Sequence, residues 1–316
     1  MPTQTSNGKA FEYACVEALV AVISPFRPVH VIASSAFETA RSFFNELSIE
    51  EQRKMMLAAR AGAAPLLKAE PKITEDGDDE LLLSIQADRE GIAGDVRDVL
   101  ILRRSIHWEI GLSVKNNHFA AKHSRLSRTI DFGKDWFGLS CSSEYYEEIE
   151  PIFKYLKEEQ SAGKLWRDMP DKVQRVYRPL LEAFKAELVR LNTGSSDVPS
   201  KLLEYLIGRY DFYKFVKIDA EQKTIVQCYN FHGTLNTGTK DSKPDFNTGV
   251  VKLPDSIRYF DYLDTAPDNT LELMLNQNWT VTFRIHNASS LVEPSLKFDI
   301  RVSGVPSNLF TAHVGW

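Results

Sequence analysis

Two short segments, VLIL at 99–102 and the alternating run WEIGLSVK at 108–115, constrain the fold of this chain more than any other part of its sequence. Successive side chains of a strand point to opposite faces, so the second segment has one apolar face and one mixed face. The apolar face holds Trp108, Ile110, Leu112 and Val114, and the mixed face holds Glu109, Gly111, Ser113 and Lys115. A reverse turn near 104–106 would join the segments and bring Asp98 beside residues 111–113. The sequence therefore predicts an antiparallel hairpin with a carboxylate and an ammonium group at one end.

Charge is distributed unevenly along the chain, which bears on the partners that it can bind. The net charge is -5, and 26% of the residues are charged. Between 97 and 128, however, only Asp98 and Glu109 oppose the basic residues Arg97, Arg103, Arg104, Lys115, Lys122, Arg125 and Arg128. Acidic residues gather instead at 76–80 and 142–151. A nucleic-acid-binding face is a local patch, so the acidic average does not exclude DNA as a partner.

The composition is that of a soluble globular protein, with 43% apolar residues in a chain of 316. The sequence has no apolar run of about 18 residues, and charged residues interrupt the amino-terminal stretch where a signal peptide would be apolar. Cys15, Cys141 and Cys228 are odd in number and far apart, which argues against a disulfide framework and a zinc site. We expect a cytoplasmic protein with reduced thiols and no membrane partner.

Helical and strand patterns alternate along the first part of the chain. The stretch 8–23 has apolar residues at helical spacing. A second helical region, 35–64, is interrupted where Ser48 and Glu51 form a capping-box pattern. Strands are expected at 79–88, 97–104 and 107–115, and the following segment 118–128 favours a helix.

The second part of the chain begins with long helices, expected at 144–163 and 169–192, and continues mostly as strand. The expected strands are 213–219, 224–231, 247–254, 256–263, 270–276, 279–287 and 295–303. This order predicts an α/β or α+β fold, in which a mixed central sheet is flanked by helices. A domain boundary is expected near residue 140 or near 195.

The grouping of Asp98 with Lys115 suits the hydrolysis of a phosphodiester. That reaction uses a carboxylate to hold Mg²⁺ and a cation to orient the attacking water or stabilise charge on the phosphorus oxygens. The alternative is an ordinary hairpin salt bridge, which contributes little. Asp98 precedes the tripeptide Ser113-Val114-Lys115 by 15 residues. This pattern resembles the PD-(D/E)XK nucleases, in which an aspartate opens one strand and a (D/E)-x-K tripeptide lies on the next.

A wider set of stretches is similar to the HaeIII-type restriction endonucleases, namely NGKAFEYAC, GDVRDVLILR, WEIGLSVKNNH, KHSRLS and DFGKDWFG. The resemblance is closest over residues 7–150. It implies a PD-(D/E)XK catalytic core at 1–140 and a helical and β-rich DNA-recognition region at 141–316. It also implies a type II restriction endonuclease, a Mg²⁺-dependent hydrolase of a restriction system that cuts double-stranded DNA at a specific sequence, here GGCC.

The resemblance has consequences for partners. A cognate methyltransferase would act on the same DNA site without forming a stable complex with the nuclease. A palindromic target favours a homodimer, although a single chain that cuts one strand at a time is also compatible. Two alternative functions stay open. One is a repair or structure-specific nuclease of the same superfamily, and the other is a DNA-binding protein that has lost cleavage.

The resemblance also implies roles for the residues of the hairpin. Asp98 is expected to bind the metal together with the main-chain carbonyl of Val114, and Lys115 is expected to polarise the attacking water. The chain departs from the family pattern at two positions. Arg97 replaces the proline, and Ser113 replaces the acidic residue. The second change matters because serine is a poor Mg²⁺ ligand beside a carboxylate.

A carboxylate from elsewhere can complete the site. Glu12, on the helix expected at 8–23, is the first candidate, because related nucleases carry an acidic or amide residue on the helix that packs against this hairpin. The competing interpretation is a solvated helix residue. Asp131 is a second candidate and Asp95 a third, although Asp95 also suits a turn after Gly94.

Glu109 is the other acidic residue of the hairpin. Four residues of extended strand place it about 13 Å from Ser113, which is too far for both to bind one ion. We expect it to pair at the surface with Arg103 or Arg104.

The residues that follow the hairpin could hold phosphate groups beside the scissile bond, because basic, hydroxyl and amide side chains commonly contact DNA phosphates. The expected DNA-binding residues are Asn117, His118, Lys122, His123, Ser124 and Arg125. The alternative is a charged, solvated helix face. The polar loop at 233–248 has side chains able to contact base edges, as many surface loops do.

Overall fold

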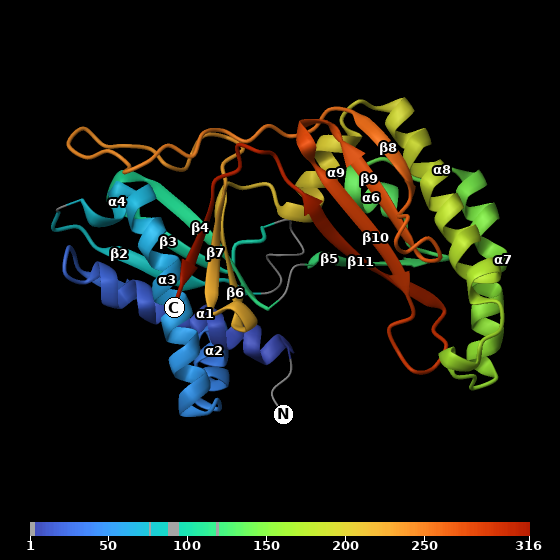
Figure 1. The fold of residues 1–316 in the computed structure, drawn as a ribbon, viewed down its shortest axis with the longest axis horizontal. Helices are drawn as coiled ribbons and strands as arrows, with labels where there is room; N and C mark the ends of the chain where they lie inside the picture. Colours follow the sequence, from blue (N-terminus) through green and yellow to red (C-terminus); the bar gives the residue numbers. More distant parts are fainter. Residues whose placement is uncertain (1–3, 76, 88–94, 118–119) are drawn as a thin grey trace. The chain divides into compact units, whose positions relative to one another are not determined.

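The computed structural model describes residues 4–75, 77–87, 95–117 and 120–316, which fold into two compact units (Figure 1). Unit 1 comprises residues 1–119, 208–251 and 308–316. Unit 2 comprises residues 120–207 and 252–307. The two units therefore interleave along the chain. The functional division into 1–140 and 141–316 stays a prediction.

Unit 1 is built on a mixed sheet, whose described strands are seven and lie in the order β1-β2-β3-β4-β6-β7-β12. Their bounds are β1 Val29–Val31, β2 Leu81–Ile85, β3 Val99–Arg103, β4 Trp108–Asn116, β6 Phe212–Ile218, β7 Lys223–Tyr229 and β12 Thr311–Gly315. The pairs β1–β2 and β4–β6 are parallel, and the other neighbours are antiparallel. Parallel neighbours need a crossover connection, and the connection from β4 to β6 contains the first segment of unit 2.

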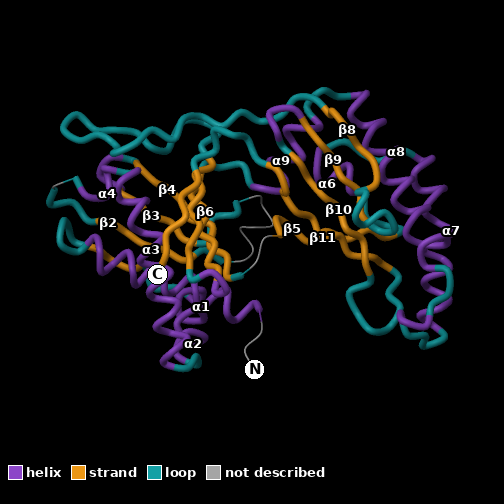
Figure 2. Tube along the Cα trace, in the orientation of Figure 1, coloured by secondary structure: helices purple, strands orange, loops and turns teal. Residues whose placement is uncertain are grey.

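Helices α1 and α3 contact each other and the sheet of unit 1 (Figure 2). The helices of this unit are α1 Gln4–Ile23, α2 Ser35–Asn45, α3 Ile49–Ala69 and α4 Pro71–Thr74. The predicted break in the second helical region is confirmed, because Ser48 caps α3 and forms a capping box with Glu51. Buried apolar side chains of α1 and α3 form one core with those of the central strands.

Unit 2 contains an antiparallel sheet with helices on one face. Its strands, five among the described residues, follow the order β5-β11-β10-β9-β8. The bounds are β5 Ala120–Ser127, β8 Ile257–Tyr262, β9 Thr270–Leu275, β10 Thr280–His286, β11 Ser295–Gly304, α6 Phe132–Phe137, α7 Ser143–Ser161, α8 Arg178–Gly194 and α9 Val198–Ile207. Phe184 of α8 packs against Phe283 of β10 and Phe298 of β11, with ring centroids 5.4 and 5.0 Å away. Aromatic rings therefore join the helices to the sheet.

Two predicted elements are wrong. The segment 118–128, expected to be a helix, contains β5, which pairs with β11. This pairing buries Leu126, and it overrides local helix preference because the partner lies far along the chain. The segment 247–254, expected to be a strand, has no regular structure. Sequence patterns also missed β1, β12, α6 and α9.

The predicted fold class is confirmed at a coarse level. The chain has a mixed sheet with helices, as the α/β or α+β prediction requires. Cys15, Cys141 and Cys228 are free thiols. Among the described residues, the helices are too short or too polar to cross a membrane.

Gly62 of α3 allows the helix to approach the sheet closely. A Cβ at this position would lie 2.6 Å from Cδ2 of Phe215, a buried side chain of β6. Gly62→Ala should therefore destabilise the protein by about 1–3 kcal/mol through overpacking. Gly8→Ala in α1 is the matched control, because no atom lies within 4 Å of its Cβ position, and it should stabilise by about 0.5–1 kcal/mol. Urea denaturation measures both, and equal midpoints for the two variants would contradict the close approach.

Candidate active site

The β3–β4 hairpin forms as the sequence predicts. The backbone N–H of Asp98 donates to the carbonyl of Leu112 at 2.7 Å, so Asp98 lies directly before β3 and beside Ser113. The turn is a 3-10 helix at Arg104–Ile106, closed by His107 in the left-handed conformation with φ of 51°. The hairpin thus places the first carboxylate of the site next to the strand that carries the lysine.

One carboxylate oxygen of Asp98 is the centre of the site. Its Oδ2 accepts hydrogen bonds from the backbone N–H of Val114 at 2.6 Å and from Lys115 Nζ at 3.1 Å. The hydroxyl of Ser113 donates to the same oxygen at 3.4 Å. The side chains of Asp98 and Lys115 keep 21% and 30% of their surface exposed. The pair is therefore held in place and still accessible to a substrate, unlike a fully buried ion pair.

Glu12 of α1 is a buried carboxyl group that interacts with this pair. It is 5% exposed, and Lys9 Nζ lies 3.2 Å from its Oε2. Burial and then the negative charge of Asp98 raise the pKa of Glu12 to about 8, while Lys9 and Lys115 act in the opposite direction. The fold thus brings together Glu12, Asp98 and Lys115, which are far apart in the sequence.

Arg97 forms a charged cluster beside Asp98. Its Nε and Nη2 donate to the two oxygens of Asp95 at 2.8 Å each, and its Nη1 donates to Glu109 at 2.9 Å. The guanidinium also stacks on Tyr210, 4.2 Å from the ring centroid. The expected partner of Glu109 was Arg103 or Arg104, and this prediction is wrong because Arg97, two residues before β3, reaches Glu109 over Gly111 of β4.

Asp95 has both carboxylate oxygens engaged within this cluster. Besides the two bonds from Arg97, its Oδ2 accepts a hydrogen bond from Gln86 Nε2 at 3.0 Å. These contacts hold the segment that leads into β3. A role for Asp95 as a secondary metal ligand stays a prediction.

Lys214 of β6 is a site residue that sequence analysis missed. It is the register partner of Ser113 across the parallel β4–β6 pair, so both side chains lie on one face of the sheet. Asp98 lies opposite Ser113 on the other side, which makes a row of three across the sheet. A signal existed in the sequence, because Lys214 interrupts the otherwise apolar run FYKFV at 212–216.

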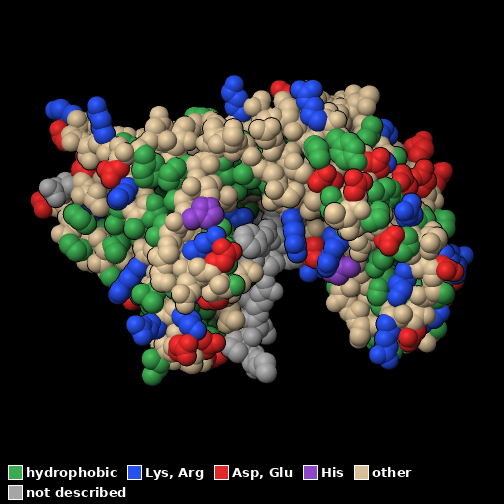
Figure 3. Space-filling view, viewed as in Figure 1, with side chains coloured by type: hydrophobic (Ala, Val, Ile, Leu, Met, Phe, Trp, Pro, Cys, Tyr) green, Lys and Arg blue, Asp and Glu red, His purple; other side chains and the backbone are tan. Residues whose placement is uncertain are grey.

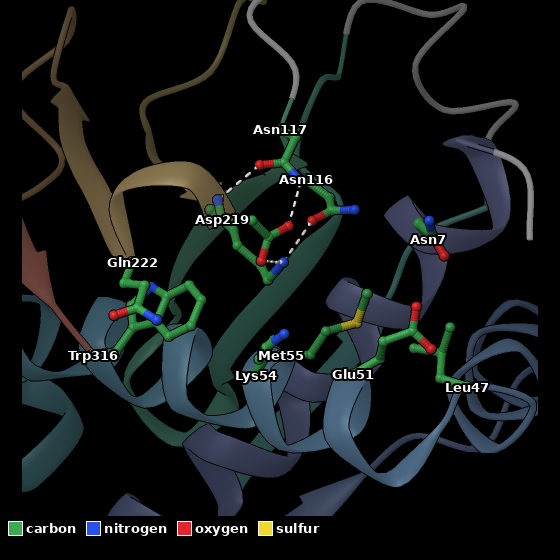
Figure 4. Close-up of a pocket in the computed structure, with 11 residues that line it drawn as sticks. Asn7, Leu47, Glu51, Lys54, Met55, Asn116, Asn117, Asp219, Gln222 and Trp316 are labelled. Atoms are coloured by element: carbon green, nitrogen blue, oxygen red, sulfur yellow. Dashed lines mark hydrogen bonds and ion pairs between the residues drawn. The ribbon is translucent and has the colours of Figure 1, made fainter.

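The end of β4 lines a cavity of about 260 Å³ (Figure 4). Asn117 donates its amide N–H to Asp219, and the backbone N–H of Asp219 donates to Asn117 Oδ1 at 2.9 Å. Lys217 forms an ion pair with Asp219 and donates to Asn116 Oδ1 at 3.2 Å. The amide of Asn117, an expected DNA-binding residue, is therefore engaged in joining the ends of β4 and β6.

The other expected DNA-binding residues belong to the segment around β5. His118 and the side chains of Lys122 and His123 lie outside the described part of the structure. The buried hydroxyl of Ser124 is 2.7 Å from the hydroxyl of Tyr205. Arg125 is exposed and contacts Ser295 at 2.7 Å and Glu293 at 3.3 Å.

Arg125 belongs to the face of the unit 2 sheet that is turned away from the aromatic core. Its register partner on β11 is Lys297, and Arg301 and Arg284 point to the same face. Asp299 and Glu272 are acidic residues of the same face, and Asp299 pairs with Arg284 at 3.1 Å. Basic side chains are visible over the β10–β11 region (Figure 3). The four basic side chains on this face, Arg125, Lys297, Arg301 and Arg284, are together called the exposed basic surface of unit 2.

Asp131, an alternative metal ligand, is the N-cap of α6 in unit 2. Its Oδ1 accepts from the backbone N–H groups of Lys134 at 2.9 Å and Cys141 at 3.0 Å.

The loop at 233–248 is anchored in unit 1, where the N–H of Asn236 donates to Glu70 at 2.6 Å. Both features have a local structural role in this conformation.

Comparison with known proteins shows similarity along nearly the whole chain. The family model described as HaeIII restriction endonuclease matches residues 8–306. The type II restriction enzyme HaeIII of Haemophilus aegyptius is 40% identical over 311 residues, which cover 98% of this chain and 97% of that enzyme. No solved structure gives a significant match. The similarity includes both units.

Gly111 makes room for Arg97 over β4. A Cβ at this position would lie 2.1 Å from Cδ of Arg97, so Gly111→Ala should displace the arginine and the adjoining Asp98. We expect the rate of DNA cleavage to fall roughly 10- to 100-fold, because small displacements of reacting groups are costly. Gly315→Ala in β12 of the same sheet is the control, since its nearest atom is 4.0 Å away. Cleavage at the normal rate by Gly111→Ala would show that Arg97 does not position the site.

Proposed function

This chain belongs to the HaeIII restriction endonuclease family, and we propose that Asp98, Lys115 and Glu12 form its DNA-cleaving centre. The membership makes it a type II restriction endonuclease, an enzyme that hydrolyses double-stranded DNA at specific sequences. The observation that carries the proposal is the geometry at Asp98. A partly exposed carboxylate and ammonium group lie 3.1 Å apart beside a buried third ionisable group.

Each residue has a distinct part in the proposed chemistry. The Lys115 ammonium group can stabilise the negative charge that accumulates on the phosphorus oxygens, or orient the attacking water. The hydrogen bond from the Val114 N–H fixes the orientation of Asp98 relative to β4. The proposal assigns this arrangement to a PD-(D/E)XK core, in which Ser113 stands where the family pattern has an acidic residue.

The donor atoms of the site fit Mg²⁺. This ion prefers oxygen ligands and keeps several waters, so one or two carboxylates are sufficient. Asp98 and Glu12 supply them; burial and then the charge of Asp98 raise the pKa of Glu12. The main-chain carbonyl of Val114 is the proposed third donor. When bound, the ion supplies Lewis-acid chemistry beside the phosphate.

The finer points of substrate and partners are also proposals. GGCC is the proposed recognition sequence, as the family resemblance implies. The exposed basic surface of unit 2, with Arg125 and Lys297, suits contact with DNA phosphates. Ser124, Lys122, His123, His118 and Asn117 remain proposed contacts. A homodimer on a palindromic site, a methyltransferase acting on the same site and a cytoplasmic location complete the proposal.

Incubation of the purified protein with plasmid DNA tests the activity directly. Discrete fragments with Mg²⁺, and none with EDTA, are expected of a restriction enzyme. A smear would indicate a nonspecific nuclease, and retarded but intact DNA would indicate a binding protein. Sequencing of the fragment ends tests GGCC.

Asp98→Ala should abolish cleavage, because it removes the acceptor of Val114 and Lys115 together with a proposed metal ligand. DNA affinity, measured in EDTA, should stay within a few-fold of the wild type, since no base or phosphate contact is removed. Lys115→Ala should also abolish cleavage. Loss of specific binding by a folded Asp98→Ala variant would count against the proposed role.

Glu12→Gln tests the source of the missing carboxylate. The amide keeps the shape of the side chain but cannot ionise to hold the metal, so cleavage should be strongly depressed and the half-maximal Mg²⁺ concentration should rise. Asp131→Asn is the control, because asparagine also caps helices well and should leave both quantities unchanged. If Asp131→Asn depresses cleavage and Glu12→Gln does not, Asp131 is the residue that supplies the missing carboxylate. Titration of the rate with Mg²⁺ measures both variants.

A further inference from the structure

Lys214 has an unusual position for a lysine. It lies within β6, one strand from Ser113 and on the same face of the sheet. Its side chain is only partly exposed, and its neighbours in the strand, Tyr213 and Phe215, are buried. Among the described residues, no hydrogen bond or ion pair is formed by its Nζ. A partly buried ammonium group without a partner is unfavourable unless an anion neutralises its charge.

The charges around Lys214 show where an anion would be drawn. Burial and then the positive charge of Lys115 lower the pKa of Lys214 to about 8, while Asp98 acts in the opposite direction. Two ammonium groups therefore approach each other on the catalytic face. Lys115 already has Asp98 as a partner at 3.1 Å. The unsatisfied positive charge is on Lys214.

We propose that Lys214 binds a phosphate group of the DNA at the cleavage site, as a second catalytic lysine beside Lys115. This inference rests on the proposed function, because the anion is the substrate of that site. The ligand is a phosphodiester, either the scissile one or its immediate neighbour along the strand. The row formed by Asp98, Ser113 and Lys214 then presents a carboxylate at one end and a free cation at the other.

This row also accounts for the neutral residue at position 113. An acidic side chain there would be the register partner of Lys214 and would neutralise it. Serine leaves the ammonium group available to the substrate, while Glu12 supplies a carboxyl group from α1. The replacement of the acidic residue of the family pattern by Ser113 is thus explained by the lysine that lies beside it on β6.

Other lysines of the same sheet differ from Lys214. Lys217 lies on the opposite face of β6, where it is buried and paired with Asp219. Lys223 opens β7 and pairs with Glu221. Each has an acidic partner within the protein, so neither is expected to bind a phosphate group of the DNA.

The test compares Lys214→Met with Lys214→Arg and with the control Lys223→Met. DNA affinity is measured in EDTA over a series of salt concentrations, and single-turnover cleavage is measured with Mg²⁺. Lys214→Met should make the slope of log affinity against log salt shallower by about one unit, as loss of one phosphate contact requires. Its cleavage rate should fall roughly 10- to 1000-fold. Lys214→Arg should retain the slope, and Lys223→Met should retain both slope and rate.

Thermal denaturation without DNA separates this role from a structural one. Because the Nζ of Lys214 has no partner within the described part of the chain, Lys214→Met should be at least as stable as the wild type. A destabilised Lys214→Met variant would show that the ammonium group is a structural partner, which overturns the inference. So would a stable variant with an unchanged salt slope. If the wild type itself neither binds nor cuts DNA, the proposed function fails. If the wild type cuts DNA and Lys214→Met binds and cuts it equally well, the proposed function stands and the inference about Lys214 is wrong.

Discussion

Strand β4 pairs on both of its edges, and the rest of the site depends on these two pairings. The antiparallel pairing with β3 places Asp98 beside Ser113, and the parallel pairing with β6 places Lys214 on the other side. A shift of one residue in either register would move the polar row to the opposite face of the sheet. The buried side chains on that opposite face, Leu112 and Tyr213 among them, prevent such a shift.

The electrostatic balance of the site follows from this geometry. Burial and then the charge of Asp98 raise the pKa of Glu12, while Lys115 and Lys214 place positive charge on the strands. Arg97 and its acidic partners form a separate cluster that fixes the entrance to β3. The site therefore holds its charges in a defined arrangement before any substrate arrives, which is the condition for electrostatic stabilisation of a transition state.

The interleaved organisation has a topological reason. Parallel strands cannot be joined by a tight turn, so the chain must make a long connection between β4 and β6. In this protein the connection contains residues 120–207, the first segment of unit 2. The second segment of that unit, residues 252–307, comes later in the sequence. Lys115 and Lys214 thus stand on either side of residues 120–207 in the sequence and lie on neighbouring strands only in the folded sheet.

The sequence by itself determined the local features of this protein. Helix α1, the capping box at Ser48 and the β3–β4 hairpin follow from patterns within short stretches, and with the hairpin came the meeting of Asp98 and Lys115. Even the family resemblance rested on such stretches. These features were predictable because period, capping and turn residues act between neighbours.

Only the tertiary structure decided which distant segments meet. Residues 120–127 form a strand because they pair with β11, whereas residues 247–254 have no regular structure. The pairing of β4 with β6 places Lys214 beside Ser113. Glu109 forms its ion pair with Arg97 instead of Arg103 or Arg104. The physical reason is that strand pairing and burial are satisfied between residues far apart in the chain, and no local pattern records which partner will be available.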